Sequence, residues 1–197
     1  MRALKMSLVL VLGVGGVWGG CSKDGASEPK PAASQGNEEP PVPATGTVPL
    51  TKLSDGQIAQ ILAAVDTAEI EQAQLALKKA TSEEVKGYAN HMIEQHTASK
   101  ETGARLASQN GLQLAESPKE KELKVKGTTT LEQLKAADDK NFDVTYLHAQ
   151  IEQHAEVLNL ITDQLQPAVS DAGLRDQLAT ARGMVSEHLD KAKLLLH

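Results

Sequence analysis

The chain has few of the side chains from which disulfides, thiolate metal sites and base-stacking surfaces are built. Its 197 residues include one cysteine, one tryptophan, one phenylalanine and two tyrosines. A single cysteine cannot close an intramolecular disulfide or supply a paired-cysteine metal site. So few aromatic side chains do not form a platform for stacked bases. We therefore expect a fold that is stabilised by apolar packing, with or without a bound metal ion.

The chain also has few basic residues for its length. Lysine and arginine number 20 against 26 aspartate and glutamate residues. Nucleic-acid binding depends on clustered basic side chains, so we expect no nucleic-acid partner. A nucleophile elbow and a glycine-rich phosphate loop are absent as well. Enzymatic activity is therefore not predicted, although a mononuclear metal hydrolase or oxidase stays open as an alternative.

The single cysteine, Cys21, follows a segment typical of a bacterial lipoprotein signal. Arg2 and Lys5 precede an apolar run over residues 6–20 that is too short to span a bilayer and ends in small residues. We predict that residues 1–20 are a signal peptide and that Cys21 carries the lipid. The acyl chain would anchor the protein to a membrane of the cell envelope, facing the periplasm. Ser22 is compatible with sorting to the outer membrane. An ordinary signal peptide followed by a free cysteine is the alternative.

Residues 21–50 have the composition of a tether. Six of the eight prolines fall between Ser22 and Leu50, among Ser, Gly, Ala, Glu and Gln. Such a segment buries too little apolar surface to fold, so we predict a disordered linker. Residues 51–197 form the predicted folded domain.

The folded domain has the composition of long helices and no strand pattern. Capping-box spacings at Ser54 with Gln57 and at Thr81 with Glu84 predict where the first two helices begin. Asn110-Gly111 ends the second helix, and Pro167 ends the third. The four long helices are expected over residues 54–80, 82–110, 139–166 and 170–197.

The connection between the second and third helices is longer and less regular. Ser117 and Pro118 predict the start of a short helix that stops by Gly127, and Thr129 with Glu132 predicts a further short turn. The predicted fold class is all-α: an antiparallel four-helix bundle with a longer connection, containing short helices, between the second and third helices.

Each long helix places one ionisable residue on its apolar seam. The four residues are Glu69, His96, His154 and His188. Three imidazoles and a carboxylate are suitable ligands for a divalent ion such as Zn, Mn, Fe or Cu, and bundle cores are where facing helices build such sites. The alternative is that the three histidines are structural core residues with hydrogen-bond partners. The remaining histidines, His91, His148 and His197, are expected near solvent.

Counting residues from the turns tests whether the four seam residues lie level. Glu69 and His96 are offset by ~4.5 Å along the bundle axis, which side chains can bridge. His154 and His188 are offset by ~9 Å, so that pair is expected to meet only if one helix shifts. No histidine has a glutamate three residues before it. A ferritin-type di-iron centre, which uses Glu-x-x-His pairs, is therefore not expected.

Several spaced motifs resemble one bacterial family when they are taken in order. They are Ala68-Glu69-Ile70; Ala80-Thr81-Ser82 with Val85, Lys86, Ala89, Met92 and His96; Asn141-Phe142-Asp143 with Tyr146, Leu147 and His154; and His188 with Ala192. The resemblance is to the domain-of-unknown-function family 4142, over roughly residues 54–195. It implies a ferritin-like bundle and an envelope location, with the family's recurrent Glu and His at Glu69, His96, His154 and His188. It implies no established activity.

The sequence thus predicts a lipid-anchored envelope bundle that binds a divalent metal ion in its core, for storage, sensing or stress protection. A non-catalytic module that binds an envelope protein through its outer faces is the alternative.

Overall fold

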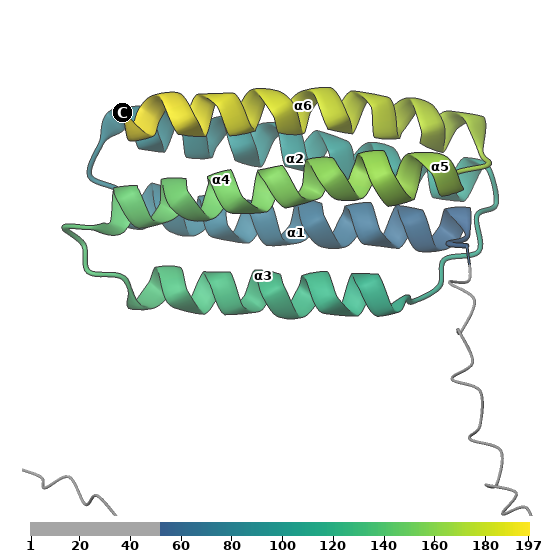
Figure 1. The fold of residues 1–197 in the computed structure, drawn as a ribbon, viewed down its shortest axis with the longest axis horizontal. Helices are drawn as coiled ribbons and strands as arrows, with labels where there is room; N and C mark the ends of the chain where they lie inside the picture. The colour runs from purple at the N-terminus through teal and green to yellow at the C-terminus, as the bar shows by residue number, and fades with distance from the viewer. Residues whose placement is uncertain (1–51) are drawn as a thin grey trace, which may run out of the picture. The chain divides into compact units, whose positions relative to one another are not determined.

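The computed structural model describes residues 52–197, which are drawn in colour in Figure 1. The predicted signal peptide, lipidation site and tether lie outside these residues. The described part is all-helical and contains no strand. Its elements are α1 (Asp55–Lys79), α2 (Glu83–Gln109), α3 (Pro118–Ala136), α4 (Phe142–Leu160), the π-helical segment η1 (Ile161–Leu165), α5 (Gln166–Ala168) and α6 (Ala172–Leu196).

The long helices pack side by side as a helical bundle, and consecutive long helices run in opposite directions (Figure 1). Helix α1 packs against α2 and α3, and α6 packs against α4 and α2. Helix α3 lies on the outside, against α1 and to a lesser extent α4. None of the described helices combines the length and the apolar character that a membrane crossing requires.

The start of α1 is the one that its sequence predicts. The Ser54 hydroxyl accepts the Gln57 N–H at 3.2 Å, and the Gln57 side chain accepts the Ser54 N–H at 3.1 Å, which completes a capping box. The start of α2 is shifted by one residue, because Ser82 and not Thr81 is its N-cap. Thr81 instead bonds to Asp143 of α4, through its N–H and its hydroxyl.

The predicted end of α2 is confirmed. Asn110 is the C-cap, and Gly111 follows with φ +62°, a left-handed conformation that glycine adopts without strain. The Leu112 N–H then bonds to the Ala107 carbonyl at 2.9 Å.

The prediction for α3 was wrong, because α3 is one helix of 19 residues that runs through Gly127. Gly127 marks a close helix contact and not a helix end. A Cβ atom at this position would lie 2.7 Å from the Cβ of Ala68 on α1, so glycine lets the two helices approach. The Lys79 side chain of α1 also donates to the Lys135 and Ala137 carbonyls, which satisfies the C-terminal end of α3.

The bounds of the third predicted helix were also wrong at both ends. It begins at Phe142, since residues 138–141 form a turn in which the Asn141 N–H bonds to the Asp138 carbonyl. At its other end the helical backbone continues past Pro167 to Ala168. Proline lacks the N–H of a regular α-helical bond. Just before it, η1 changes the hydrogen-bond pattern, with the Gln166 N–H bonding to the Ile161 carbonyl.

The core consists of two apolar clusters with a polar layer between them. One cluster is centred on Ile58, Ile61, Ile161, Leu165, Leu174 and Leu178. The other is centred on Met92, Leu134, Phe142, Tyr146 and Ala192. On α1, α4 and α6 the polar residues of this layer fall between these sets: Asp66, Glu69 and Gln72 on α1, Gln150, Gln153 and His154 on α4, and His188 on α6. On α2, the buried His96 follows Met92 of the second cluster by about one turn.

Candidate metal site

Three histidines from three helices meet in the polar layer. His96 of α2, His154 of α4 and His188 of α6 are each at most 2% exposed. One ring nitrogen of each lies within 4.8 Å of the corresponding nitrogens of the other two. The ring centroids are 5.2 Å apart for His96 and His188, 5.4 Å for His154 and His188, and 6.0 Å for His96 and His154. The packing of α2, α4 and α6 thus assembles one compact imidazole cluster.

Each of the three rings has one nitrogen that bonds to an oxygen. His96 Nδ1 lies 2.8 Å from Asp66 Oδ1, and His154 Nδ1 lies 2.9 Å from the Gln150 carbonyl. His188 Nε2 lies 2.9 Å from Gln95 Oε1. Because carboxylate, carbonyl and amide oxygens accept hydrogen bonds, these nitrogens carry the ring hydrogens.

The second nitrogen of each ring is buried and has no hydrogen-bond partner. These atoms are His96 Nε2, His154 Nε2 and His188 Nδ1. In a neutral imidazole the nitrogen without hydrogen carries a lone pair, which is the donor that a metal ion needs. A ligating histidine usually donates its other N–H to an oxygen, and all three rings here do so.

The surroundings keep two of the rings neutral. Burial lowers the pKa of His154, and His96 lowers it further against the opposing effects of Glu69 and the Gln150 carbonyl. Burial and the neighbouring His96, His154 and His91 rings lower the pKa of His188 to about 3. At neutral pH both rings are therefore in the form that binds metal, with no proton to expel.

Two carboxylates give the polar layer negative charge. Asp66 and Glu69 are each 3% exposed, and one oxygen of each, Asp66 Oδ2 and Glu69 Oε2, has no hydrogen-bond partner. Among the described residues no lysine or arginine is buried. Buried charges are normally paired or coordinate metals, so a divalent cation among the histidines would balance these two carboxylates.

Two buried tyrosines border the layer on the side of the second apolar cluster. The Tyr88 hydroxyl donates to the His188 carbonyl at 3.3 Å, and the ring of Tyr146 lies 6.1 Å from that of Tyr88. Burial and the Glu69 charge raise the pKa of Tyr88, and burial, Tyr88 and Glu69 raise the pKa of Tyr146. Both phenols therefore stay protonated.

A glutamine network fixes the α4 side of the site. Gln72 Oε1 accepts from Gln150 Nε2 at 3.1 Å and from Gln153 Nε2 at 2.9 Å. Gln72 Nε2 in turn donates to Gln153 Oε1 at 3.0 Å. These bonds join α1 to the turn of α4 whose Gln150 carbonyl orients His154.

A family model for a domain of unknown function, DUF4142, matches residues 40–195, which include the whole polar layer and the long helices except for Leu196, the last residue of α6. The chain belongs to the DUF4142 family. Neither the curated proteins nor the solved structures contain a significant match. The family is defined without an activity.

The expected separation of His154 and His188 was wrong. In the DUF4142 domain His154 lies 14 residues before Ala168, where the helical backbone ends, and His188 lies 16 residues after Ala172, where α6 begins. At 1.5 Å per residue this is an axial offset of ~3 Å and not ~9 Å. Two shifted bounds contribute equally to the change: the helical backbone extends past Pro167 to Ala168, and α6 begins at Ala172, two residues later than predicted.

The other predicted residues of the DUF4142 domain lie as follows. Glu69 is buried in the same layer and close enough to raise the pKa of His154, while the group of atoms within 4.8 Å consists of histidine nitrogens. His91, His148 and His197 are exposed. His91 is nevertheless near the cluster, with its ring centroid 5.5 Å from that of His188.

Sequence reasoning missed Asp66 and Gln95, which hold His96 and His188. Asp66 is one residue beyond the seam position Val65, so it falls on the flank of the predicted seam. Its spacing of three residues from Glu69 is a signal that both carboxylates share one helix face.

Proposed function

We propose that this domain binds one divalent transition-metal ion in its core through His96, His154 and His188, with Glu69 as the fourth ligand. The observation that carries the proposal is the pattern at the three rings: each has one nitrogen bonded to an oxygen and one buried nitrogen without a partner. Each unsatisfied buried polar atom lowers the stability of the folded state by ~1–3 kcal/mol, so three of them in one cluster are unusual in a purely structural core.

The ligand types select the class of metal ion. Imidazole suits zinc, copper and iron, and a single carboxylate also accommodates manganese. On one tetrahedral zinc ion at 2.0–2.1 Å the nitrogens lie about 3.3 Å apart. Since one nitrogen of each ring already lies within 4.8 Å of one nitrogen of each of the other two rings, small ring rotations would close the site. The sequence contains no Glu-x-x-His pair, which argues against a two-metal oxidising centre.

The setting is proposed from the sequence. Cys21 would anchor the chain to the outer membrane through its lipid, and residues 22–50 would hold a ferritin-like four-helix core, made by α1, α2, α4 and α6, in the periplasm. In that position a bound metal ion would serve storage, sensing or protection against envelope stress.

Elemental analysis of protein purified without a polyhistidine tag tests the proposal. Wild-type protein is expected to hold about one equivalent of metal, and the His96→Ala/His154→Ala double variant none. The proposal would be refuted if wild-type protein, incubated in turn with Zn²⁺, Mn²⁺, Fe²⁺ and Cu²⁺, held no metal above the background level.

The contact between His96 and Asp66 favours a second candidate function. If His96 carries two hydrogens, the pair is an internal salt bridge at 2.8 Å that neutralises Asp66 without metal. The histidines are then structural, and the bundle acts as a non-catalytic module that binds an envelope protein. This candidate predicts that a chelator leaves the melting temperature unchanged while crosslinking recovers a partner.

A further inference from the structure

A surface pocket leads from solvent to one of the three core histidines. It lies between α2 and α6, has a volume of about 540 Å³ and is lined by Tyr88, Leu195, Glu84, His91, Glu187 and His188 among others. His188 is 1% exposed and has an unpartnered Nδ1, while His91, Glu84 and Glu187 are exposed. The pocket therefore joins exposed side chains of types that can ligate a metal ion to the buried His188 nitrogen, which lacks a partner.

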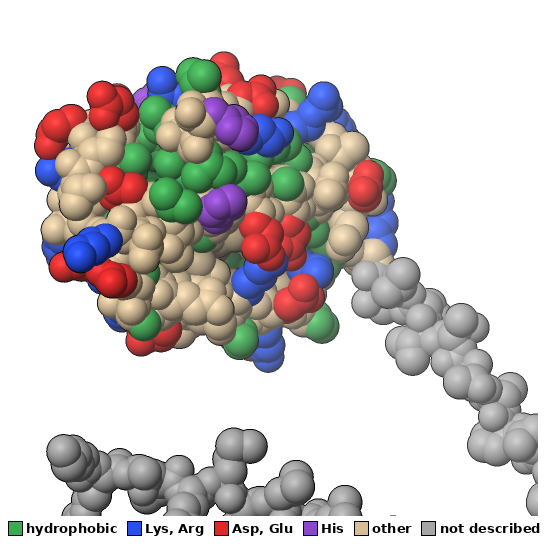
Figure 2. Space-filling model, turned by 60° about the vertical axis from the view of Figure 1, so that its left-hand side comes forward, with side chains coloured by type: hydrophobic (Ala, Val, Ile, Leu, Met, Phe, Trp, Pro, Cys, Tyr) green, Lys and Arg blue, Asp and Glu red, His purple; other side chains and the backbone are tan. Residues whose placement is uncertain are grey.

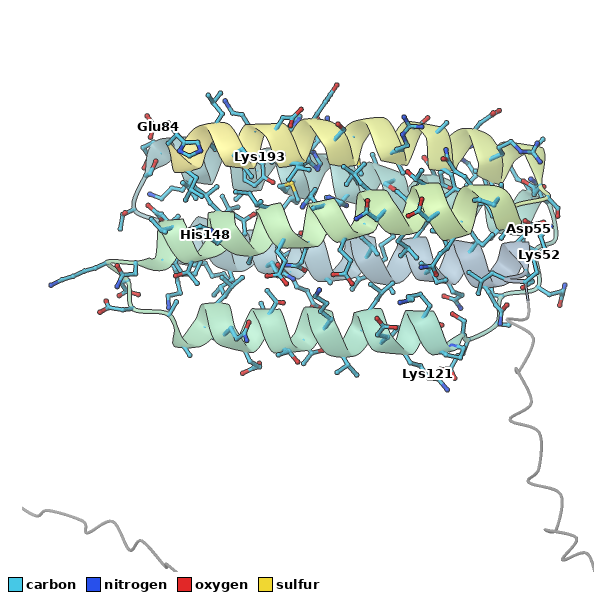
Figure 3. The ribbon with its side chains drawn as sticks, viewed as in Figure 1. Lys52, Asp55, Glu84, Lys121, His148 and Lys193 are labelled. Atoms are coloured by element: carbon cyan, nitrogen blue, oxygen red, sulfur yellow. The ribbon has the colours of Figure 1, made fainter. Side chains whose placement is uncertain are left out.

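His91 connects the exposed groups of the pocket with the buried His188. Its ring centroid lies 5.5 Å from that of His188, about the spacing of the core rings from one another. Glu84 reaches the pocket from the first turn of α2, beside the C-terminal end of α6 (Figure 3), and Glu187 reaches it from α6. Figure 2 shows histidine side chains at the surface beside hydrophobic ones, with acidic side chains near them.

The opposite side of the site does not offer a comparable route. A cavity between α1, α3 and α4 touches Glu69, but its volume is about 20 Å³. A water molecule occupies ~30 Å³ of liquid, so this space holds at most about one water, and a hydrated divalent ion carries several. Lys126, which also lines this cavity, is paired there with Glu156.

We propose that the α2–α6 pocket is an uptake site for the metal ion, in which His91 with Glu187 and Glu84 binds the divalent cation and passes it to His188. This rests on the proposed function, since it concerns how the same ion reaches the core. The two carboxylates attract the cation, and the imidazole replaces part of its hydration before it reaches the buried nitrogens. Lys191, which also lines the pocket, opposes the cation and limits the rate.

The rate of Co²⁺ loading, followed by its visible absorption in a stopped-flow instrument, tests the proposal on the full chain. His91→Ala is expected to slow loading about tenfold, at the low end of the range for electrostatically focused sites, with an unchanged final stoichiometry. Lys191→Gln is expected to speed loading. His148→Ala is the matched control, because it removes an exposed histidine of α4 outside the pocket and should load at the wild-type rate.

The outcomes separate the two proposals. Wild-type protein that binds no Co²⁺ at equilibrium overturns the core site and the uptake site together. Wild-type protein that binds one equivalent, with His91→Ala loading equally fast, overturns the uptake site alone. Loss of equilibrium affinity in His91→Ala at an unchanged loading rate also overturns it, because His91 would then be a ligand of the core site.

Discussion

His96 Nδ1 and Asp66 Oδ1 lie 2.8 Å apart, with both side chains withdrawn from solvent. This contact joins α2 to α1 and fixes which nitrogen of His96 is left free. It is therefore the place where the chemistry of the site and the packing of the bundle depend on the same atoms.

Asp66→Asn tests the role of this contact in metal binding. The amide preserves the shape but not the charge, so His96 becomes a weaker donor, and metal affinity should fall about 10- to 100-fold. Competition with a chromophoric chelator measures the change. Asp163→Asn, at an exposed position of η1, is the control and should bind like wild type. Equal affinities in the two variants would show that Asp66 is structural only.

The stability of the metal-free protein should fall as the pH drops below ~6.5. The folded pKa values of His154 and His188 lie below 6.5, that of His188 at about 3, whereas unfolded histidine titrates near 6.5. Between these limits the unfolded chain takes up protons that the folded chain rejects. The free energy of unfolding then decreases by at most ~1.4 kcal/mol per pH unit for each histidine, and above pH ~6.5 it is unaffected by them.

Urea unfolding at several pH values between 4 and 8 measures this dependence. His188→Asn should have a shallower slope below pH 6.5, and the exposed-site control His148→Asn should keep the wild-type slope. If His188→Asn kept the wild-type slope, His188 would not be a source of the pH dependence.

Glu69→Gln should raise the stability of the metal-free protein and reduce the stabilisation that metal provides. In the metal-free protein it removes a buried charge whose Oε2 has no partner, so the variant should be more stable by ~1–2 kcal/mol. With metal at 100 times its Kd, wild type gains ~2.7 kcal/mol, and the variant should gain less. Melting temperatures with and without Zn²⁺ measure both effects. An unchanged metal-dependent gain would remove Glu69 from the ligand set.

Gly127→Ala should destabilise the packing of α3 on α1. The new methyl group would lie 2.7 Å from Ala68 Cβ, so the helices must separate, at a cost of ~1–3 kcal/mol. Gly183→Ala is the matched control in α6, where a Cβ meets nothing within 4 Å. It should stabilise the protein by ~0.5–1 kcal/mol through helix propensity alone. Chemical denaturation measures the free energy of unfolding of both variants. A change of the same sign in the two variants would contradict the prediction.

The sequence was sufficient where a feature is local. The capping box at Ser54, the helix end at Asn110 and the seam positions of the three core histidines depend on spacing within one helix, and all appear in the structure. The sequence was insufficient where the role of a residue depends on its contact with a neighbouring helix. Gly127 was predicted as a helix end because its contact with Ala68 involves another element.

The same limit applies to the site. Three buried histidines were predicted from three separate seams, but the relative height of His154 and His188 depends on where the helical backbone ends after Pro167 and where α6 begins. Asp66 and Gln95 were not predicted as hydrogen-bond partners, because each bonds to a histidine on a different helix from its own.

The polar layer between the two apolar clusters also bears on how the helices align during folding. If one helix slid by a turn relative to its neighbours, an imidazole or a carboxylate would enter an apolar cluster and a leucine or alanine would face the remaining polar groups. Such a misaligned bundle would lose the Asp66–His96 and Gln72–Gln153 bonds at once. The layer thus selects a single register for four helices, and a metal ion bound there would hold that register against slow unfolding.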